Sequence, residues 1–198
     1  MSALFSRISE LYDAGLALGE LDLHHDTRIP ADAIDFRPAA VLAAITDRPT
    51  PGVLLLHRPS NMRAHPGQIA LPGGKIDAGE SPVDAALREA WEELGIDPAK
   101  VRLIGEGDLY RTASGYEITP VIGVVPADIA IDPNPQEVAQ WFEAPLEFLL
   151  DPANQQQGLI DWEGEMHPYW GISWEGHDIW GVTAGILVNL SRRLRWHG

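Results

Sequence analysis

The sequence has no cysteine among its 198 residues. Disulfide bonds, zinc–thiolate sites and cysteine nucleophiles are therefore excluded. It also has no run of 18 apolar residues, and its first 20 residues carry acidic groups but no apolar core of the length found in signal peptides. We therefore expect a cytoplasmic protein that does not interact with membranes.

Positive charge is scarce as well, with 14 lysine and arginine residues against 29 acidic ones and a formal net charge of −15. So acidic a chain disfavours nucleic acid and anionic membranes as partners. A small anionic substrate stays compatible with it, provided that basic groups gather locally or that metal ions supply positive charge.

The pattern of apolar and turn-forming residues predicts both strands and helices. No repeat, low-complexity tract or linker divides residues 1–198, so we expect one domain, with a helix and a loop in residues 1–35 packed on its main body. Residues 59–79 are rich in glycine and proline and are expected to form a long loop. Four strands, a strand leading into a short helix, and a closing helix are expected at 39–46, 52–58, 102–109, 117–126, 135–150 and 179–196.

One further helix, expected between Ser81 and Gly95, has an unusual acidic face. At about 100° per residue, three carboxylates fall on one side of it, those of Glu89, Glu92 and Glu93. A solvated acidic face is the ordinary interpretation of such a pattern. However, no lysine stands among the three acids, and a glycine-rich loop leads directly into the helix. These features favour a site for a hard divalent cation such as Mg²⁺ or Mn²⁺, which would offset the repulsion between the carboxylates.

Gly74, Glu80 and the segment 88–96 stand at the spacing of the Nudix box, G-x5-E-x7-R-E-U-x-E-E-x-G-U. The sequence resembles the Nudix family at every invariant position of this motif. The one soft departure is Ala90, where the pattern prefers a larger aliphatic residue. The resemblance implies an α/β fold, namely an α/β/α sandwich around a mixed β-sheet. It also implies hydrolysis of a nucleoside diphosphate linked to another moiety, with Mg²⁺ or Mn²⁺ as cofactor.

The resemblance extends to the roles of individual residues. The catalytic set that it implies is Glu80, Arg88, Glu89, Glu92 and Glu93. The last three would bind the metal together with the backbone carbonyl of Gly74, and Arg88 with Glu80 would orient them. The general base would be a glutamate of the motif, such as Glu89, or an acid from a later loop, for which Glu137 is a candidate. An exposed acid at a strand edge is an equally good interpretation of Glu137.

Acidic residues are missing altogether from residues 51–76, where the chain average predicts about four. The same stretch carries five basic or imidazole side chains, those of His57, Arg58, Arg63, His65 and Lys75. A buried strand and chance would explain part of this bias. The alternative is a local positive region beside the proposed metal site, which would suit an anionic substrate.

Residues 54–77 resemble the additional signature of the coenzyme A diphosphatase branch of the Nudix family, roughly LLTxRSxxLRxHxGQVxFPGGxxD. The sequence departs from it at Leu56, Pro59, Met62 and Leu71. Segments 112–126, 137–146 and 180–187 also look like that branch. The resemblance implies cleavage of coenzyme A, its thioesters or its oxidised form to 3′,5′-ADP and 4′-phosphopantetheine or its acylated version. Candidate substrate-binding residues are Arg58, Arg63, His65, Gln68 and Lys75, of which Arg63 or Arg58 would contact the 3′-phosphate.

Two other hypotheses remain open at this point. The protein could hydrolyse another nucleoside diphosphate derivative, such as ADP-ribose, NADH or a dinucleoside polyphosphate, or it could be a regulator that binds nucleotides without catalysis. Several aromatic residues could stack on adenine, although packing in the core or in a homodimer is the simpler reading of each: Trp141, Trp162, Trp170, Trp174 and Trp180.

Overall fold

The structure is a computed structural model that describes residues 2–19, 21, 23–29, 35–60 and 67–196. Its centre is the parallel pair of β1 (Arg37–Thr46) and β7 (Tyr116–Val125), which stay in register over ten residues. β1 is rich in alanine and β7 in valine and isoleucine, and such apolar sequences suit strands that are covered on both faces. No helix in the described ranges is both long and apolar enough to cross a bilayer.

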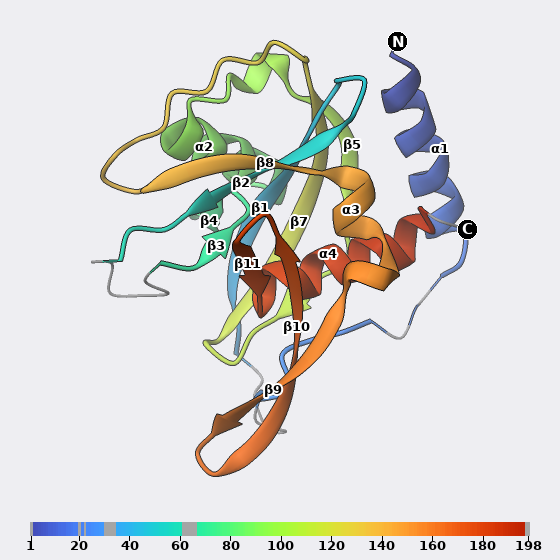
Figure 1. The fold of residues 1–198 in the computed structure, drawn as a ribbon. Coiled ribbons are helices and arrows are strands. Elements are labelled where there is room, and N and C mark those ends of the chain that lie inside the picture. Colours follow the sequence, from blue (N-terminus) through green and yellow to red (C-terminus); the bar gives the residue numbers. More distant parts are fainter. Residues whose placement is uncertain (1, 20, 22, 30–34, 61–66, 197–198) are drawn as a thin grey trace.

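The other strands complete a mixed sheet around this pair, in the order β3-β2-β1-β7-β5, with β4 paired to β1, β6 to β7 and β8 to β2. Their bounds are β2 (Gly52–His57), β3 (Ile69–Ala70), β4 (Gly73–Lys75), β5 (Arg102–Glu106), β6 (Tyr110–Arg111) and β8 (Gln140–Pro145). A second, antiparallel sheet contains β9 (Gln156–Trp162), β10 (Glu165–Trp174) and β11 (His177–Trp180), and its β9–β10 hairpin projects from the rest of the molecule (Figure 1).

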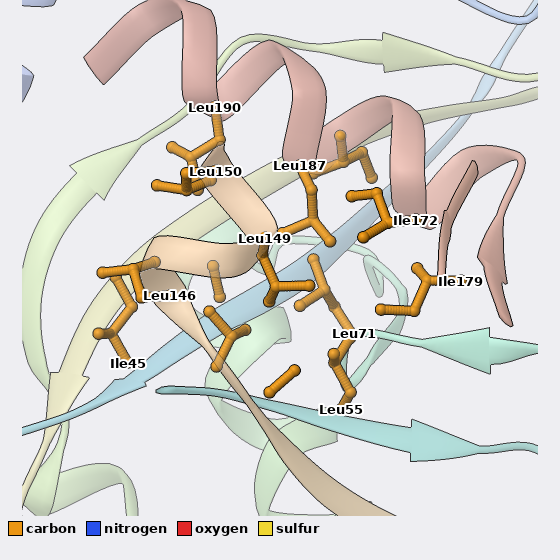
Figure 2. Close-up of a cluster of buried hydrophobic side chains, with 14 of the residues drawn as sticks. Ile45, Leu55, Leu71, Leu146, Leu149, Leu150, Ile172, Ile179, Leu187 and Leu190 are labelled. Atoms are coloured by element: carbon orange, nitrogen blue, oxygen red, sulfur yellow. The ribbon is translucent and has the colours of Figure 1, made fainter. Parts of the chain in front are cut away.

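Helices cover both faces of the mixed sheet, which is the α/β/α arrangement expected. One face packs against α2 (Pro82–Leu94), through the alternate residues Ala40, Leu42 and Ala44 of β1. The other face packs against α1 (Ala3–Leu16), α3 (Leu146–Leu150) and α4 (Val182–Leu194). Figure 2 shows how Leu146, Leu149 and Leu187 meet Ile45 and Leu55 of the sheet on this second face. Two short 3₁₀ helices, Pro98–Lys100 and Pro152–Asn154, lie in connections.

Three parts of the chain differ from the sequence-based expectation. The expected loop at 59–79 contains the short strands β3 and β4, which its glycines and prolines concealed. Residues 156–178, to which the sequence analysis assigned no element, form most of the second sheet. The closing helix begins at Val182 rather than at 179, because residues 177–180 pair with β10 as strand β11.

Candidate active site

The acidic helix α2 begins and ends where its sequence indicates. The side chain of Ser81 accepts a hydrogen bond from the backbone N–H of Asp84, and Pro82 occupies the first turn. Gly95 ends the helix in the left-handed conformation, with φ of 67°, which costs glycine little. The soft position of the motif, Ala90, is fully buried against the sheet. Its small side chain therefore suits the close packing of this helix.

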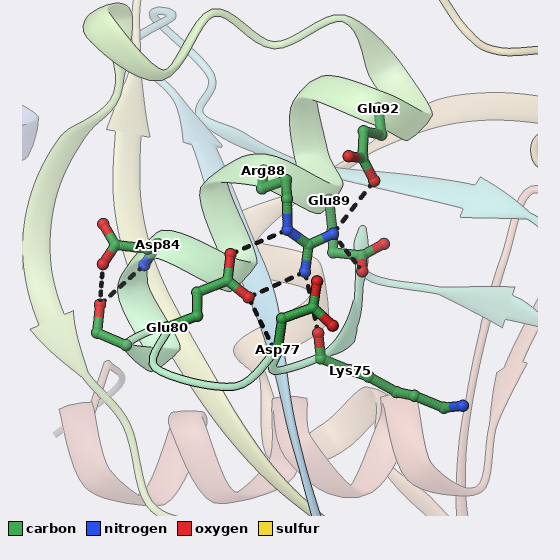
Figure 3. A network of polar contacts seen from close by, with 8 residues as sticks. Lys75, Asp77, Glu80, Asp84, Arg88, Glu89 and Glu92 are labelled. Carbon is green, nitrogen blue, oxygen red and sulfur yellow. Dashed lines mark hydrogen bonds and ion pairs between the residues drawn. The ribbon is translucent and has the colours of Figure 1, made fainter.

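Arg88 connects the loop before α2 to the acidic face of the helix (Figure 3). Its Nε and Nη2 donate to the two carboxylate oxygens of Glu80 at 2.9 and 3.1 Å, and Nη2 also donates to the carbonyl of Lys75 at 3.0 Å. Its Nη1 donates to Glu89 at 2.8 Å and to Glu92 at 3.2 Å. Hydrogen bonds from the guanidinium to Glu80 and Glu89 raise the pKa of Arg88 above its ordinary value. Arg88 therefore fixes two of the three glutamates relative to the loop.

The two glycines of β4 let the carboxylates of α2 come close to the sheet. The backbone N–H of Gly73 donates to Oε2 of Glu93 at 2.9 Å. A Cβ atom on Gly74 would overlap the carboxylate of Glu89. Any residue with a side chain at position 74 would therefore push Glu89 away from the backbone of β4.

The carboxylate of Glu93 is almost completely buried, at 3% exposure. Burial raises its pKa to about 8, against the hydrogen bond from Gly73 and the nearby charge of Arg58, while the negative charges of Glu89 and Glu137 raise it further. Burial also raises the pKa of Glu89, with Glu137 again contributing repulsion. The negative charges of Glu89 and Glu137 therefore both act on the buried carboxyl group of Glu93.

These carboxylates lie at one end of a cleft of about 440 Å³. The floor of the cleft is the α4-facing side of β1 and β7, and its opposite wall is the start of α4. Because β4 carries glycines, the carboxylates of α2 reach this cleft from the other side of the sheet. Seven residues expected from the sequence to form the site line it, namely Arg58, Gln68, Gly74, Lys75, Glu89, Glu93 and Glu137.

Three other expected residues in the described part of the chain do not line the cleft. Arg88, Glu80 and Glu92 belong to the polar network on α2 rather than to the lining of the cleft, and the side chain of Glu92 is 48% exposed. Arg63 and His65 lie outside the described residues. Sequence reasoning assigned no role to the cleft residues Thr112, Ser114 and Tyr116. Their segment resembled the coenzyme A branch, but nothing in its spacing connected it to the acidic helix.

The donor set of the cleft fits a hard divalent cation. Its lining includes the carboxylates of Glu89, Glu93 and Glu137, and the charges of the partly buried Glu89 and the buried Glu93 repel each other, so that a cation between them would lower the energy of their charged forms. Within the described part of the chain, no three acidic or histidine side chains gather closely enough to form a complete metal site. Glu89 and Glu93 face the cleft, whereas Glu92 contacts Arg88.

Comparison with known proteins identifies the family in which this arrangement occurs. The model of the NUDIX domain matches residues 36–162. The chain belongs to the Nudix domain family. Nudix proteins are hydrolases of nucleoside diphosphate derivatives and generally use divalent cations such as Mg²⁺ or Mn²⁺. The matched range contains the Nudix box and every site residue described above except the first turns of α4, which follow it.

This Nudix protein is similar along most of its length to two bacterial relatives. It is 40% identical over 169 residues to a protein described as an uncharacterized Nudix hydrolase, NudL, of Enterobacter sp. (strain 638), and the match covers 84% of this chain and 88% of the relative. It is 39% identical over 169 residues, with the same coverage, to the protein of that description from Escherichia coli (strain K12).

Two solved structures resemble part of the chain. The Nudix hydrolase RenU from M. smegmatis is 26% identical, with a TM-score of 0.49 over 58% of this chain and 73% of the other. The Ap4A hydrolase of C. elegans is 20% identical, with a TM-score of 0.48 over 55% of this chain and 80% of the other.

Proposed function

We propose that this Nudix protein hydrolyses the diphosphate bond of coenzyme A or one of its derivatives. The products would be 3′,5′-ADP and 4′-phosphopantetheine or its acylated form. The observation that carries this proposal is the composition of the cleft. It combines the carboxylates of Glu89, Glu93 and Glu137 with two cations, Arg58 and Lys75, that come from the acid-free segment 51–76.

The acidic end of the cleft would hold the metal ions. Glu89 and Glu93 would bind Mg²⁺ or Mn²⁺, with Glu92 and the carbonyl of Gly74 as additional ligands. When bound, such ions neutralise a diphosphate and lower the pKa of a coordinated water. Arg88 orients Glu89 and Glu92. Glu137 lies in the same cleft and is the proposed general base.

Arg58 is the best-supported substrate-binding residue. Its Nε is buried and, in the described part of the chain, has no hydrogen-bond partner. A buried donor without a partner costs free energy, and a phosphate oxygen would provide a charge-assisted acceptor. Coenzyme A carries a 3′-phosphate in addition to its diphosphate, and either group would supply such an acceptor to Arg58, whose charge lies near Glu93 at the acidic end of the cleft.

Product analysis by mass spectrometry tests the choice of substrate. The protein is incubated with Mg²⁺ or Mn²⁺ and a panel of coenzyme A, acyl-coenzyme A, ADP-ribose, NADH and dinucleoside polyphosphates. Release of 3′,5′-ADP from coenzyme A as the fastest reaction supports the proposal. Rapid turnover of another member, with coenzyme A intact, would assign the enzyme to that substrate. Tight nucleotide binding with no product at any metal concentration would instead support a regulatory role.

A comparison of two arginine variants tests the 3′-phosphate contact. Arg58→Ala and Arg63→Ala are each assayed with coenzyme A and with its 3′-dephospho form. The variant that loses the contact should raise KM for coenzyme A by about tenfold, as expected for a charged hydrogen bond, and leave KM for the dephospho form unchanged. Equal increases for both substrates would place that arginine on the diphosphate. A homodimer and a cytoplasmic location, both expected from the sequence, stay predictions.

A further inference from the structure

The end of the cleft that lies away from the carboxylates contains a single aromatic side chain among its described lining residues, that of Tyr116. Tyr116 is the first residue of β7 and pairs with Arg37 at the start of β1. The guanidinium carbon of Arg37 lies 4.0 Å from the centroid of the tyrosine ring. The arginine therefore covers one side of the ring, and Tyr116 also lines the cleft.

The segment that carries this ring is held in place by several hydrogen bonds. The N–H of Tyr116 donates to Oγ1 of Thr112 at 3.0 Å, and the N–H of Thr112 donates to the carbonyl of Tyr116 at 2.9 Å. Nη2 of Arg37 donates to the carbonyl of Ser114 at 2.8 Å, and the N–H of Ala113 donates to Asp26 at 3.1 Å. These bonds fix the backbone that carries the ring before any ligand binds, which reduces the entropic cost of binding.

The distance between the two ends of the cleft suits a nucleoside. At the metal end, Gly74 pairs with Ala40 of β1, and at the other end Tyr116 pairs with Arg37. Three residues of a strand span roughly 10 Å. The floor between the ends is apolar, with Ala39 and Ile118 paired side by side and both lining the cleft. A diphosphate at the acidic end therefore leaves room for a ribose, followed by a planar group at Tyr116.

We propose that Tyr116, supported by Arg37, is the platform on which the base of the nucleoside diphosphate substrate stacks. The five tryptophans considered from the sequence for this role do not line the cleft in the described part of the chain. The flat faces of a base and a tyrosine attract each other, and a cation behind the ring fixes its plane. This inference rests on the proposed hydrolysis of a nucleoside diphosphate, but not on the choice of coenzyme A.

Binding of ADP and of inorganic pyrophosphate, measured by calorimetry with Mg²⁺ on the full chain, tests the platform. The two probes share a diphosphate, and only ADP carries a base. Stacking contributes about 1–3 kcal/mol, so Tyr116→Leu should weaken ADP binding by about 5- to 150-fold and leave pyrophosphate binding within about twofold. Tyr116→Phe keeps the aromatic face and should bind ADP within about threefold of the wild type.

Tyr169→Leu provides a matched control, because Tyr169 lies on β10 and does not line this cleft. It should leave both affinities unchanged. Equal weakening of ADP and pyrophosphate binding by Tyr116→Leu, or an unchanged ADP affinity, would overturn the proposal. If coenzyme A is cleaved but Tyr116→Leu binds ADP normally, the proposed stacking role of Tyr116 is wrong and the proposed substrate stands. If coenzyme A is not cleaved but ADP binding depends on Tyr116, only the choice of substrate fails.

Discussion

Glu92 and Glu93 are neighbours in the sequence, but the fold gives them different surroundings. Glu93 is buried beside Gly73 and has a raised pKa, whereas Glu92 is half exposed and contacts Arg88. A buried carboxylate that costs stability is retained when its charge is needed for function. At the residue scale, stability and activity should therefore respond in opposite ways to changes at position 93.

Glu93→Gln is expected to lower kcat by about two orders of magnitude or more, because an amide is a poor ligand for Mg²⁺. The melting temperature should stay constant or rise, since the amide oxygen can still accept from Gly73 while the cost of burying an ionisable carboxyl group is gone. Glu92→Gln should also lower kcat, with no change in melting temperature. Steady-state kinetics and thermal unfolding of both variants provide the measurement. A collapse of the melting temperature in Glu93→Gln, with metal-activated turnover retained, would contradict the assignment of Glu93 to the metal.

At the scale of single elements, the two adjacent glycines of β4 should respond differently to the addition of a side chain. Gly74→Ala would displace the flexible end of Glu89, whereas a Cβ on Gly73 would meet the backbone of Ala40 and Val41. We expect Gly74→Ala to reduce kcat at least tenfold with little loss of stability, and Gly73→Ala to lower the melting temperature clearly. Thermal unfolding and kinetics of the pair test this. Equal melting temperatures for the two variants would contradict it.

The contact between β2 and β11 provides a prediction about pH. Nε2 of His57 lies 2.9 Å from Nδ1 of His177, and the ring of His177 stacks on Phe142 with centroids 3.8 Å apart. Burial, and secondly the neighbouring His177, lower the pKa of His57, against a hydrogen bond with the backbone of Gly67. Because burial disfavours the charged form of the ring, the folded protein favours a neutral His57.

Because the folded protein lowers the pKa of His57, this residue makes the free energy of unfolding depend on pH. Below about pH 6.5 an unfolded chain binds a proton at His57 that the folded protein resists, so the free energy of unfolding falls as the pH drops. His57→Gln should lose less stability than the wild type between pH 7.5 and pH 5.5. Urea unfolding at several pH values measures the difference. Parallel curves for the two proteins would show that His57 does not contribute.

The sequence predicted some elements closely and missed others for identifiable reasons. The bounds of α2 were predictable because Ser81, Pro82 and Gly95 specify local hydrogen bonds and dihedral angles that need no tertiary partner. Strands β3 and β4 were not, because strands of two or three residues depend on pairing with β2 and β1. The same limit applies to the site. Spacing along one helix grouped the glutamates, but only the fold brings Glu137 and Tyr116 into the same cleft.

At the scale of the whole molecule, one buried arginine joins three distant segments. Arg193 of α4 is 5% exposed and binds the carboxylate of Asp108. Its Nη1 donates to the carbonyls of Gly15 and Gly19, each at 2.8 Å, at the end of α1. The attachment of α1 to the main body therefore depends on a residue far away in the sequence.

Arg193→Met should lower the free energy of unfolding by about 3 kcal/mol, because it leaves Asp108 and two carbonyls without their donor. For a chain of this size the melting temperature should fall by roughly 6–12 °C. Asp108→Asn is the milder counterpart, since its amide oxygen still accepts from Arg193. Urea and thermal unfolding give both values. A melting temperature of Arg193→Met equal to that of the wild type would show that α1 is held by its apolar contacts alone.

Metal binding should also appear in the stability of the whole molecule, without any assay of turnover. A ligand that binds only the folded state at 100 times its Kd stabilises it by about 2.7 kcal/mol. Saturating Mg²⁺ or Mn²⁺ should therefore raise the melting temperature of the wild type, and raise it less in Glu89→Gln. An identical increase in the two proteins would place the cation elsewhere.

The two glycines of β4, which let the carboxylates of α2 reach the cleft, have a consequence for how this enzyme can diverge in evolution. Most of the groups proposed to bind the metal are carried by α2 on one side of the sheet, whereas the surface proposed to meet the remainder of the substrate belongs to a second layer, the α4-facing side of β7 together with α4. Substitutions in the second layer can exchange one leaving group for another while the reactive machinery is inherited unchanged. The two tasks can therefore evolve at different rates within a single chain.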